Sequence, residues 1–153
     1  MFDDRSARDK SKSRIVLVSA DDDFVQTARS VLDANSTAEF SVQSDLNGHA
    51  VERESCDAAV LIVDIGAIEQ QEQRLLELGQ LMARIGSELP VITVVDAFNE
   101  VAARKLVQMR VADILVKPVA AIELLRACAR VTRIGREESQ IHTFLPVAGG
   151  RCV

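Results

Sequence analysis

Aromatic residues are scarce in this 153-residue chain, which has five Phe and neither Trp nor Tyr. Its core must therefore be built mainly from Val, Ile, Leu and Ala, a composition typical of parallel α/β sheets whose strands are buried on both faces. No apolar run approaches the roughly 20 residues that a membrane-spanning helix needs. The first 14 residues also lack the apolar region of a signal peptide. We therefore expect a cytoplasmic protein that does not insert into a membrane.

Cysteine and histidine are also few. Cys56, Cys128 and Cys152 form no metal-binding or redox spacing, and an odd count suits a reducing compartment. His49 and His142 support no histidine-based metal or catalytic site. A formal net charge of −5 argues against the basic surface on which nonspecific nucleic-acid binding depends. The sequence thus predicts neither an enzyme nor a nucleic-acid-binding protein.

What the chain does contain is a regular alternation of short apolar runs with longer amphipathic segments. The segments between the runs have apolar residues at helical spacing, as in Leu75, Leu78 and Met82, and a last helix is expected over 121–134. This alternation predicts βαβ units and a parallel sheet. Five such units in this length predict an α/β, flavodoxin-like doubly wound sheet with strand order 2-1-3-4-5. The predicted strands are 15–19, 40–42, 58–63, 91–95 and 114–116.

Both ends of the chain depart from this pattern. Residues 1–13 mix charges with serines and show no apolar period, which predicts a disordered N-terminal arm. After the α/β region, residues 14–134, the segment 135–140 has the composition of a linker. Residues 141–147 predict a further strand that runs into glycines, as a phosphate-binding loop does at its start. We therefore expect residues 135–153 to be a linker and the first strand of a following P-loop ATPase domain.

Charged residues follow three of the predicted strands. Asp21, Asp22 and Asp23 come after the first strand, Asp64 ends the third, and Lys117 follows the fifth. The carboxyl ends of parallel strands share one edge of the sheet, where ligands bind. Carboxylates from two strands and an ammonium from a third should therefore converge. The Asp residues after the first strand are equally suited to capping the helix that follows, and Lys117 can pair with Asp64 for structural reasons alone.

This constellation resembles the CheY-like receiver domain, the phospho-acceptor module of bacterial two-component signalling. The resemblance implies that Asp64, in LIVDIG, is the phospho-acceptor position and that the Lys-Pro pair at Lys117 is the lysine that contacts the phosphoryl group. It also implies an acidic pair that holds Mg²⁺ together with the acceptor. That pair is Asp21 and Asp22, or Ala20 and Asp21 if the first strand is aligned by its apolar run.

Two positions after the fourth strand depart from the receiver pattern. Val95 stands where receivers carry a Thr or Ser that bonds the phosphoryl group, and Asp96 stands where they usually carry a small neutral residue. Valine cannot donate a hydrogen bond. A carboxylate would repel the phosphoryl group, since two like charges about 4 Å apart cost about 4 kcal/mol at an effective dielectric near 20. We therefore expect no catalytic residue, no metal, no cofactor and little use of the acceptor position.

Two other functions are weighed against this non-catalytic reading. The first is a phosphorylatable receiver in which Asp21, Asp22 and Asp64 hold Mg²⁺ and Asp64 accepts the phosphoryl group. The second is a flavodoxin-like enzyme that binds FMN. The second is disfavoured because three carboxylates after the first strand would repel the phosphate of the flavin.

The last predicted helix carries a stripe of arginines. Arg126, Arg130 and Arg133 recur at helical spacing, and Glu100 and Asp113 are acidic residues that could pair with them. Receivers often dimerise through this region, so we expect a homodimer. The alternative is a solvated face, with arginines near a helix C-terminus favoured by the helix dipole.

A degenerate receiver followed by FLPVAGG resembles the N-terminal region of the TadZ/CpaE proteins. Those proteins join an atypical receiver to a MinD/ParA-like ATPase and help to localise the Flp-type (tight-adherence) pilus secretion machinery. The resemblance implies a protein-interaction module that has this machinery as a partner and is recruited through partners to the inner face of the membrane or the cell pole. Any ATPase activity would belong to a domain C-terminal to this chain.

Overall fold

The computed structural model describes residues 14–35, 39–46, 49–86 and 88–144, which form five strands and five helices in alternation. The N-terminal arm expected over 1–13 lies outside these residues. The strands are β1 (Arg14–Val18), β2 (Glu39–Gln43), β3 (Ala58–Gly66), β4 (Val91–Val95) and β5 (Asp113–Val116). The helices are α2 (Asp22–Asn35), α3 (His49–Ser55), α4 (Ile68–Ile85), α5 (Glu100–Gln108) and α6 (Ala121–Phe144).

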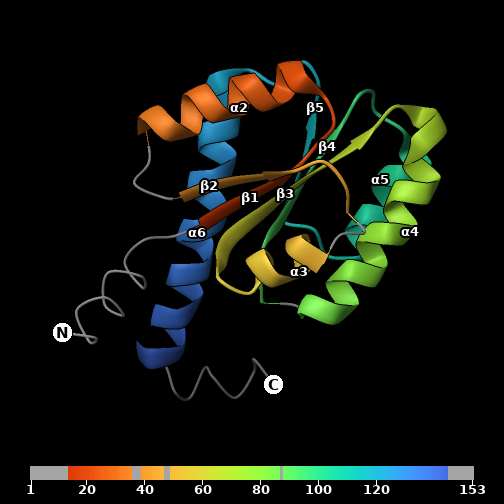
Figure 1. Cartoon of the computed structure of the whole chain (residues 1–153). Helices are drawn as coiled ribbons and strands as arrows, with labels where there is room; N and C mark the ends of the chain where they lie inside the picture. Colours follow the sequence, from red (N-terminus) through yellow and green to blue (C-terminus); the bar gives the residue numbers. More distant parts are fainter. Residues whose placement is uncertain (1–13, 36–38, 47–48, 87, 145–153) are drawn as a thin grey trace.

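The strands form one parallel sheet in the order β2-β1-β3-β4-β5 (Figure 1). This order confirms the flavodoxin-like topology predicted from the sequence. In such a sheet β1 and β3 are neighbours near the centre, and the chain reverses its direction of winding there. The carboxyl ends of β1, β3, β4 and β5 consequently lie along one edge.

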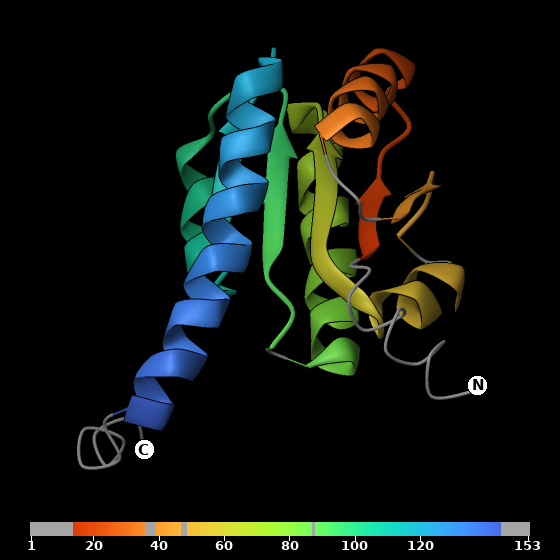
Figure 2. The same cartoon turned by 90° about the vertical axis from the view of Figure 1, so that its left-hand side faces the viewer.

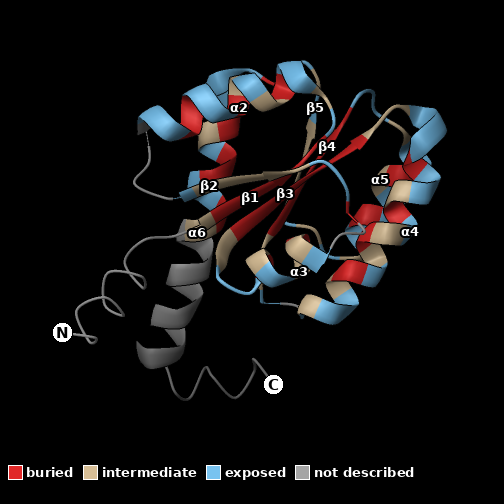
Figure 3. Cartoon of the chain, in the orientation of Figure 1, coloured by how far each residue is buried: buried red, intermediate tan, exposed pale blue. Residues whose placement is uncertain are grey.

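Helices cover both faces of the sheet, and the alternation of side chains along each strand divides the core between them. In β1, Ile15 and Leu17 pack toward α2 and α6. Val16 and Val18 pack toward α3, α4 and α5. Figure 3 shows the central strands buried along their length, with exposed residues on the outer surfaces of the helices. Burial on both faces explains why these strands are continuous runs of Val, Ile and Leu.

The last helix is longer than the sequence predicts. It runs to Phe144 rather than ending near Ile134, so residues 135–144 are helical, and the expectation of a linker and a strand there is wrong. The helix is anchored by Leu124, Ala127 and Val131, which are buried against the sheet. A single internal glycine costs only about 1 kcal/mol, which is not enough to end a helix. Figure 2 shows α6 continuing past the ends of the strands.

The remaining expectations about the C-terminal part are not addressed by this structure. Residues 145–153 lie outside the described residues, so the following ATPase domain stays a prediction. Within the described part of the chain, no helix is both long and apolar enough to cross a membrane.

Candidate functional site

Four side chains from four strand ends face the same side of the sheet at its carboxyl edge. Strand side chains alternate between the two faces. Each of the four comes two residues after a residue of the same strand that packs toward α2 and α6, so its side chain lies on that same face. Those earlier residues are Leu17, Ile62, Val94 and Leu115. The site is therefore set by the register of the strands. The four residues are Ser19 after β1, Asp64 within β3, Asp96 after β4 and Lys117 after β5.

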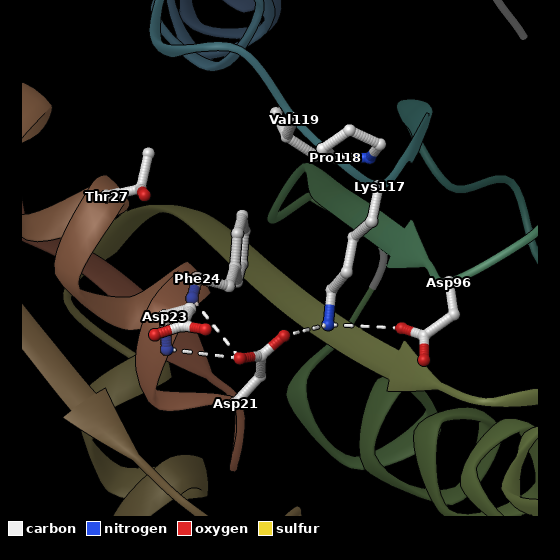
Figure 4. Close-up of a pocket in the computed structure, with 8 residues that line it drawn as sticks. All are labelled: Asp21, Asp23, Phe24, Thr27, Asp96, Lys117, Pro118 and Val119. Atoms are coloured by element: carbon white, nitrogen blue, oxygen red, sulfur yellow. Dashed lines mark hydrogen bonds and ion pairs between the residues drawn. The ribbon is translucent and has the colours of Figure 1, made fainter.

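The ammonium of Lys117 is surrounded by three carboxylates. Its Nζ lies 2.7 Å from Oδ2 of Asp21, 2.8 Å from Oδ2 of Asp64 and 3.1 Å from Oδ1 of Asp96. Figure 4 shows Asp21 and Asp96 approaching the ammonium from opposite sides. The sequence predicted the meeting of Lys117 with Asp64. We call Lys117 and its three partners, Asp21, Asp64 and Asp96, the Lys117 cluster.

The pKa of Lys117 reflects two opposing effects. Burial disfavours the charged form and lowers the pKa, because only 17% of the side chain is exposed. Hydrogen bonds to Asp21 and Asp64, the charge of Asp64 and the bond to Asp96 raise the pKa by more, so it lies above its usual value. Lys117 is thus a permanently charged centre at neutral pH.

The carboxylate of Asp64 is buried and already accepts three hydrogen bonds. Ser19 Oγ donates to Oδ2 at 2.7 Å, and the backbone N–H of Gly66 donates to Oδ1 at 2.9 Å. The third donor is Lys117, which also bonds Oδ2. Asp64 is 4% exposed. The carboxylate of Asp64 is therefore held in place by its neighbours on both oxygens.

Asp21 serves both the cluster and the start of α2. Its Oδ1 accepts the backbone N–H groups of Asp23 and Phe24, at 3.1 and 3.4 Å, which caps the helix. Its Oδ2 bonds Lys117, and this bond is the main reason why the pKa of Asp21 is lowered. The two readings of this residue from the sequence are thus compatible.

Asp22 belongs to the acidic pair in one of the two alignments considered from the sequence, and the structure places it away from the cluster. It is the exposed first residue of α2. A cavity of about 320 Å³ beside the cluster is lined by Ala20, Asp21 and Asp64, but not by Asp22. Of the residues in the two alignments, Ala20 and Asp21 line this cavity and Asp22 does not.

The sequence-based alignment puts Val95 at the site, whereas the structure puts Asp96 there. Val95 is buried on the face covered by α4 and α5, so its side chain does not reach the site. The next residue has the opposite parity, and Asp96 places a carboxylate at the site, where it bonds Lys117. The departure at the end of β4 is thus a single change, from a neutral hydrogen-bond donor to an acceptor with a negative charge.

Three contributors to the site were missed in the sequence. Ser19 ends the predicted strand 15–19, and the alternation of side chains along that strand would have placed it on the same face as Leu17. Gly66, at φ +87°, allows the backbone to turn so that its N–H reaches Asp64. Arg74 donates to the main-chain carbonyl of Asp64 at 3.4 Å and lines the same cavity. No local signal in the sequence connects Arg74 with the site, because it lies on α4.

The arrangement does not fit the Mg²⁺ that receivers bind. Mg²⁺ requires near-octahedral oxygen ligands and retains several waters, whereas the oxygens of Asp21 and Asp64 are bonded to N–H, O–H and ammonium donors. Across the part of the chain that the structure describes, no group of three His, Cys, Asp or Glu side chains is placed to hold a metal ion. The carboxylates are arranged around an ammonium instead.

Three of the five interface candidates form ion pairs within the chain. Arg130 bonds the carboxylate of Asp113 in β5, and Glu100 bonds Arg104 one turn further along α5. Arg126 is exposed on α6. The side chain of Arg133 lies outside the described residues.

Comparisons with known proteins agree with the fold. No family model matches the sequence, and no curated protein matches it. A CheY-like response regulator from Mesorhizobium loti is 26% identical with a TM-score of 0.63, over 78% of this chain and 98% of that one. A receiver domain protein from Methanospirillum hungatei is 14% identical with a TM-score of 0.71, over 83% and 98%. A pilus assembly-related protein from Burkholderia pseudomallei is 16% identical with a TM-score of 0.61, over 81% and 92%. The chain thus has the CheY-like fold of response regulator receiver domains.

Proposed function

We propose that this chain is an atypical receiver domain that acts as a non-catalytic protein-interaction module. The observation that carries the proposal is the Lys117 cluster, in which three carboxylates surround one ammonium. The cluster has an excess of two negative charges even with Lys117 protonated. Like charges about 4 Å apart repel by about 4 kcal/mol at an effective dielectric near 20, so an incoming phosphoryl group is opposed.

The acceptor itself is also poorly prepared for attack. Hydrogen bonds from Ser19, Gly66 and Lys117 occupy three of the roughly four lone-pair sites of the Asp64 carboxylate and so reduce the nucleophilicity of its oxygens. Phosphoryl transfer depends on positioning and on positive charge that balances the transferred group. In this chain Lys117 is shared with two further carboxylates, so little of its charge is left for that purpose.

Exposed apolar side chains on α5, β5 and α6 support an interaction role. Val107 on α5, Val116 at the end of β5 and Ile122 on α6 are all more than 40% exposed. They belong to the same three elements as Glu100, Asp113 and Arg126. Surface ion pairs contribute little alone, and apolar contacts of this kind supply the association energy that the charges lack. We infer that this face, the α5–β5–α6 surface, mediates self-association.

We further propose that the partner machinery belongs to pilus assembly, as in TadZ/CpaE proteins. Two observations support this. The departures from the receiver pattern fall at Asp96 and in the acidic pair, and one of the structures with the same fold is a pilus assembly-related protein. Under this proposal the domain works inside the cell and reaches the membrane or the cell pole through its partners.

Phosphodonor labelling tests the non-catalytic proposal. The protein is incubated with millimolar acetyl phosphate and Mg²⁺, and its intact mass is measured, with Asp64→Asn as the control for label on Asp64. We expect no label that distinguishes the two proteins. Stoichiometric labelling that Asp64→Asn abolishes would instead establish the alternative function, a phosphorylatable receiver.

A further inference from the structure

A second surface of the domain is hollowed into an open groove. It lies between α4 and α5, away from the Lys117 cluster, and has a volume of about 480 Å³. The two helices cover the same face of the sheet and lie side by side (Figure 1). The residues that line the groove include Glu69, Glu72, Leu75, Leu76, Lys105 and Met109.

The groove has an apolar floor and an apolar wall. Gly79 faces α5 at the base of the groove, since a Cβ there would lie 3.5 Å from the sulfur of Met109, an ordinary contact distance. Leu75 is buried beneath the opening, whereas Leu76 is 58% exposed on the α4 side. On α5, Val101 is 65% exposed and lies one turn before Lys105, on the same side of the helix. Large exposed apolar side chains that adjoin a groove mark a binding surface more often than isolated ones do.

The charges that frame the groove have no partner within the described residues. Glu69 and Glu72 are three residues apart on the α4 side, and Lys105 lies on the α5 side. In the described ranges, none of the three side chains forms a hydrogen bond or an ion pair. Other charges on the same two helices are paired, such as Arg84 with Glu52 and Arg104 with Glu100. Unpaired charges of opposite sign thus stand on opposite sides of one apolar groove.

We propose that this groove binds an amphipathic helix of a partner protein. The helix would bury bulky apolar side chains against Leu75, Leu76 and Met109, which is how helices dock in grooves. Charge complementarity specifies its flanks: basic residues beside Glu69 and Glu72, and acidic residues beside Lys105. Lys105 lies on the side of α5 opposite Val107 of the α5–β5–α6 surface, so a self-associated domain can hold one partner helix on each copy.

The test uses two fluorescently labelled model peptides with the same helical leucine stripe. One has lysines along one flank and glutamates along the other, and its twin has glutamates along both. Fluorescence anisotropy should show saturable binding with preference for the first peptide. Glu69→Gln combined with Glu72→Gln should remove that preference, and Leu76→Gln should weaken both peptides by about fivefold or more, as loss of a contact worth about 1 kcal/mol does.

Two controls make the result decisive. Asp33→Asn, which changes an exposed side chain on α2 outside both proposed surfaces, should leave peptide binding unchanged. Equal binding of both peptides to the unmodified protein, absence of saturable binding, or indifference to Leu76→Gln would overturn the proposal. Loss of self-association in Leu76→Gln, measured by sedimentation, would assign the groove to a second copy of the chain and would also overturn it.

Discussion

At the scale of single residues, Lys117 is the group on which the candidate site depends. Its ammonium is the only cation within ion-pairing distance of Asp21, Asp64 and Asp96 in the described part of the chain. Removing one partner of a buried charged pair leaves the remaining charge desolvated and unbalanced, which costs more than the pair contributes when intact. Here the buried remaining charge is Asp64, while the two other carboxylates are partly exposed and can recover water.

Replacing Lys117 with Met should therefore destabilise the domain by roughly 1–3 kcal/mol. Urea unfolding at pH 7 measures the change. Lys105→Met is the matched control, because Lys105 is exposed and unpaired in the described structure, and its effect should stay within about 0.5 kcal/mol. Equal stability of the two variants would mean that the cluster does not contribute to the fold.

The pH dependence of stability should report the bond between Asp21 and Lys117. The pKa of Asp21 is lowered in the folded protein, mainly by the hydrogen bond from Lys117. The stabilisation is therefore present above the unfolded pKa of about 3.9 and is lost as the pH falls through the lower folded pKa. Asp21→Asn keeps an oxygen that can cap α2. It should cost roughly 0.5–1 kcal/mol at pH 7, as exposed pairs do.

Unfolding measured at pH 7 and again below pH 4 tests this prediction. The difference between the unmodified protein and Asp21→Asn should shrink at the lower pH, since protonation of Asp21 removes the charge that the substitution removes. A difference that stays constant across this range would trace the effect to the helix cap and not to the ion pair.

At the scale of elements, the turn between β3 and α4 holds the side chain of Asp64 in place. Gly66 ends β3 at φ +87°, donates its N–H to Asp64 and accepts the side-chain amide of Gln71 through its carbonyl. Its carbonyl also accepts the backbone N–H of Asp96 at 3.3 Å. One residue thereby connects the ends of β3 and β4 with the start of α4.

Gly66→Ala should consequently destabilise the domain by about 1–3 kcal/mol, because only glycine adopts this backbone conformation without strain. The new Cβ would also lie 2.9 Å from Oε1 of Gln70, although that side chain can move away. Thermal unfolding measures the effect. Gly79→Ala, within α4, is the control and should be neutral or stabilising by up to about 1 kcal/mol. Similar behaviour of both variants would show that the turn carries no strain.

The elements themselves could largely be predicted from the sequence, because each buried strand is a mostly apolar run and each helix has an apolar stripe. The end of α6 could not. Gly135 has the appearance of a helix end, but the helix is held by residues packed upstream, and tertiary contacts outweigh a weak local signal. The strand-end residues were predictable as a group, since parallel topology brings them to one edge.

At the scale of the whole molecule, the prediction of the site was limited by side-chain direction. Asp96 reaches Lys117 and Val95 does not, because successive side chains along a strand point to opposite faces. An alignment shifted by one residue assigns Val95 to the site instead. The contact of Arg74 with the β3–α4 turn depends on the packing of a helix on the sheet, which no local pattern reveals. The sequence therefore predicts the charged edge, whereas the arrangement of three carboxylates around one lysine requires the fold.

The whole domain, under the proposed function, is an interaction module whose association does not wait for phosphorylation. The exposed side chains of Val107, Val116 and Ile122 supply the surface in the absence of any phosphodonor. Ile122→Glu should weaken self-association at least tenfold, since it places a charge in an apolar contact. Arg130→Glu should have a smaller effect, because Arg130 already bonds Asp113 within the chain.

Sedimentation velocity with and without acetyl phosphate and Mg²⁺ tests this central claim most directly. The account predicts the same concentration-dependent self-association in both conditions, weakened by Ile122→Glu and unchanged by Asp64→Asn. Association that occurs only with the phosphodonor, and that Asp64→Asn abolishes, would contradict it and make the domain a phosphorylation switch.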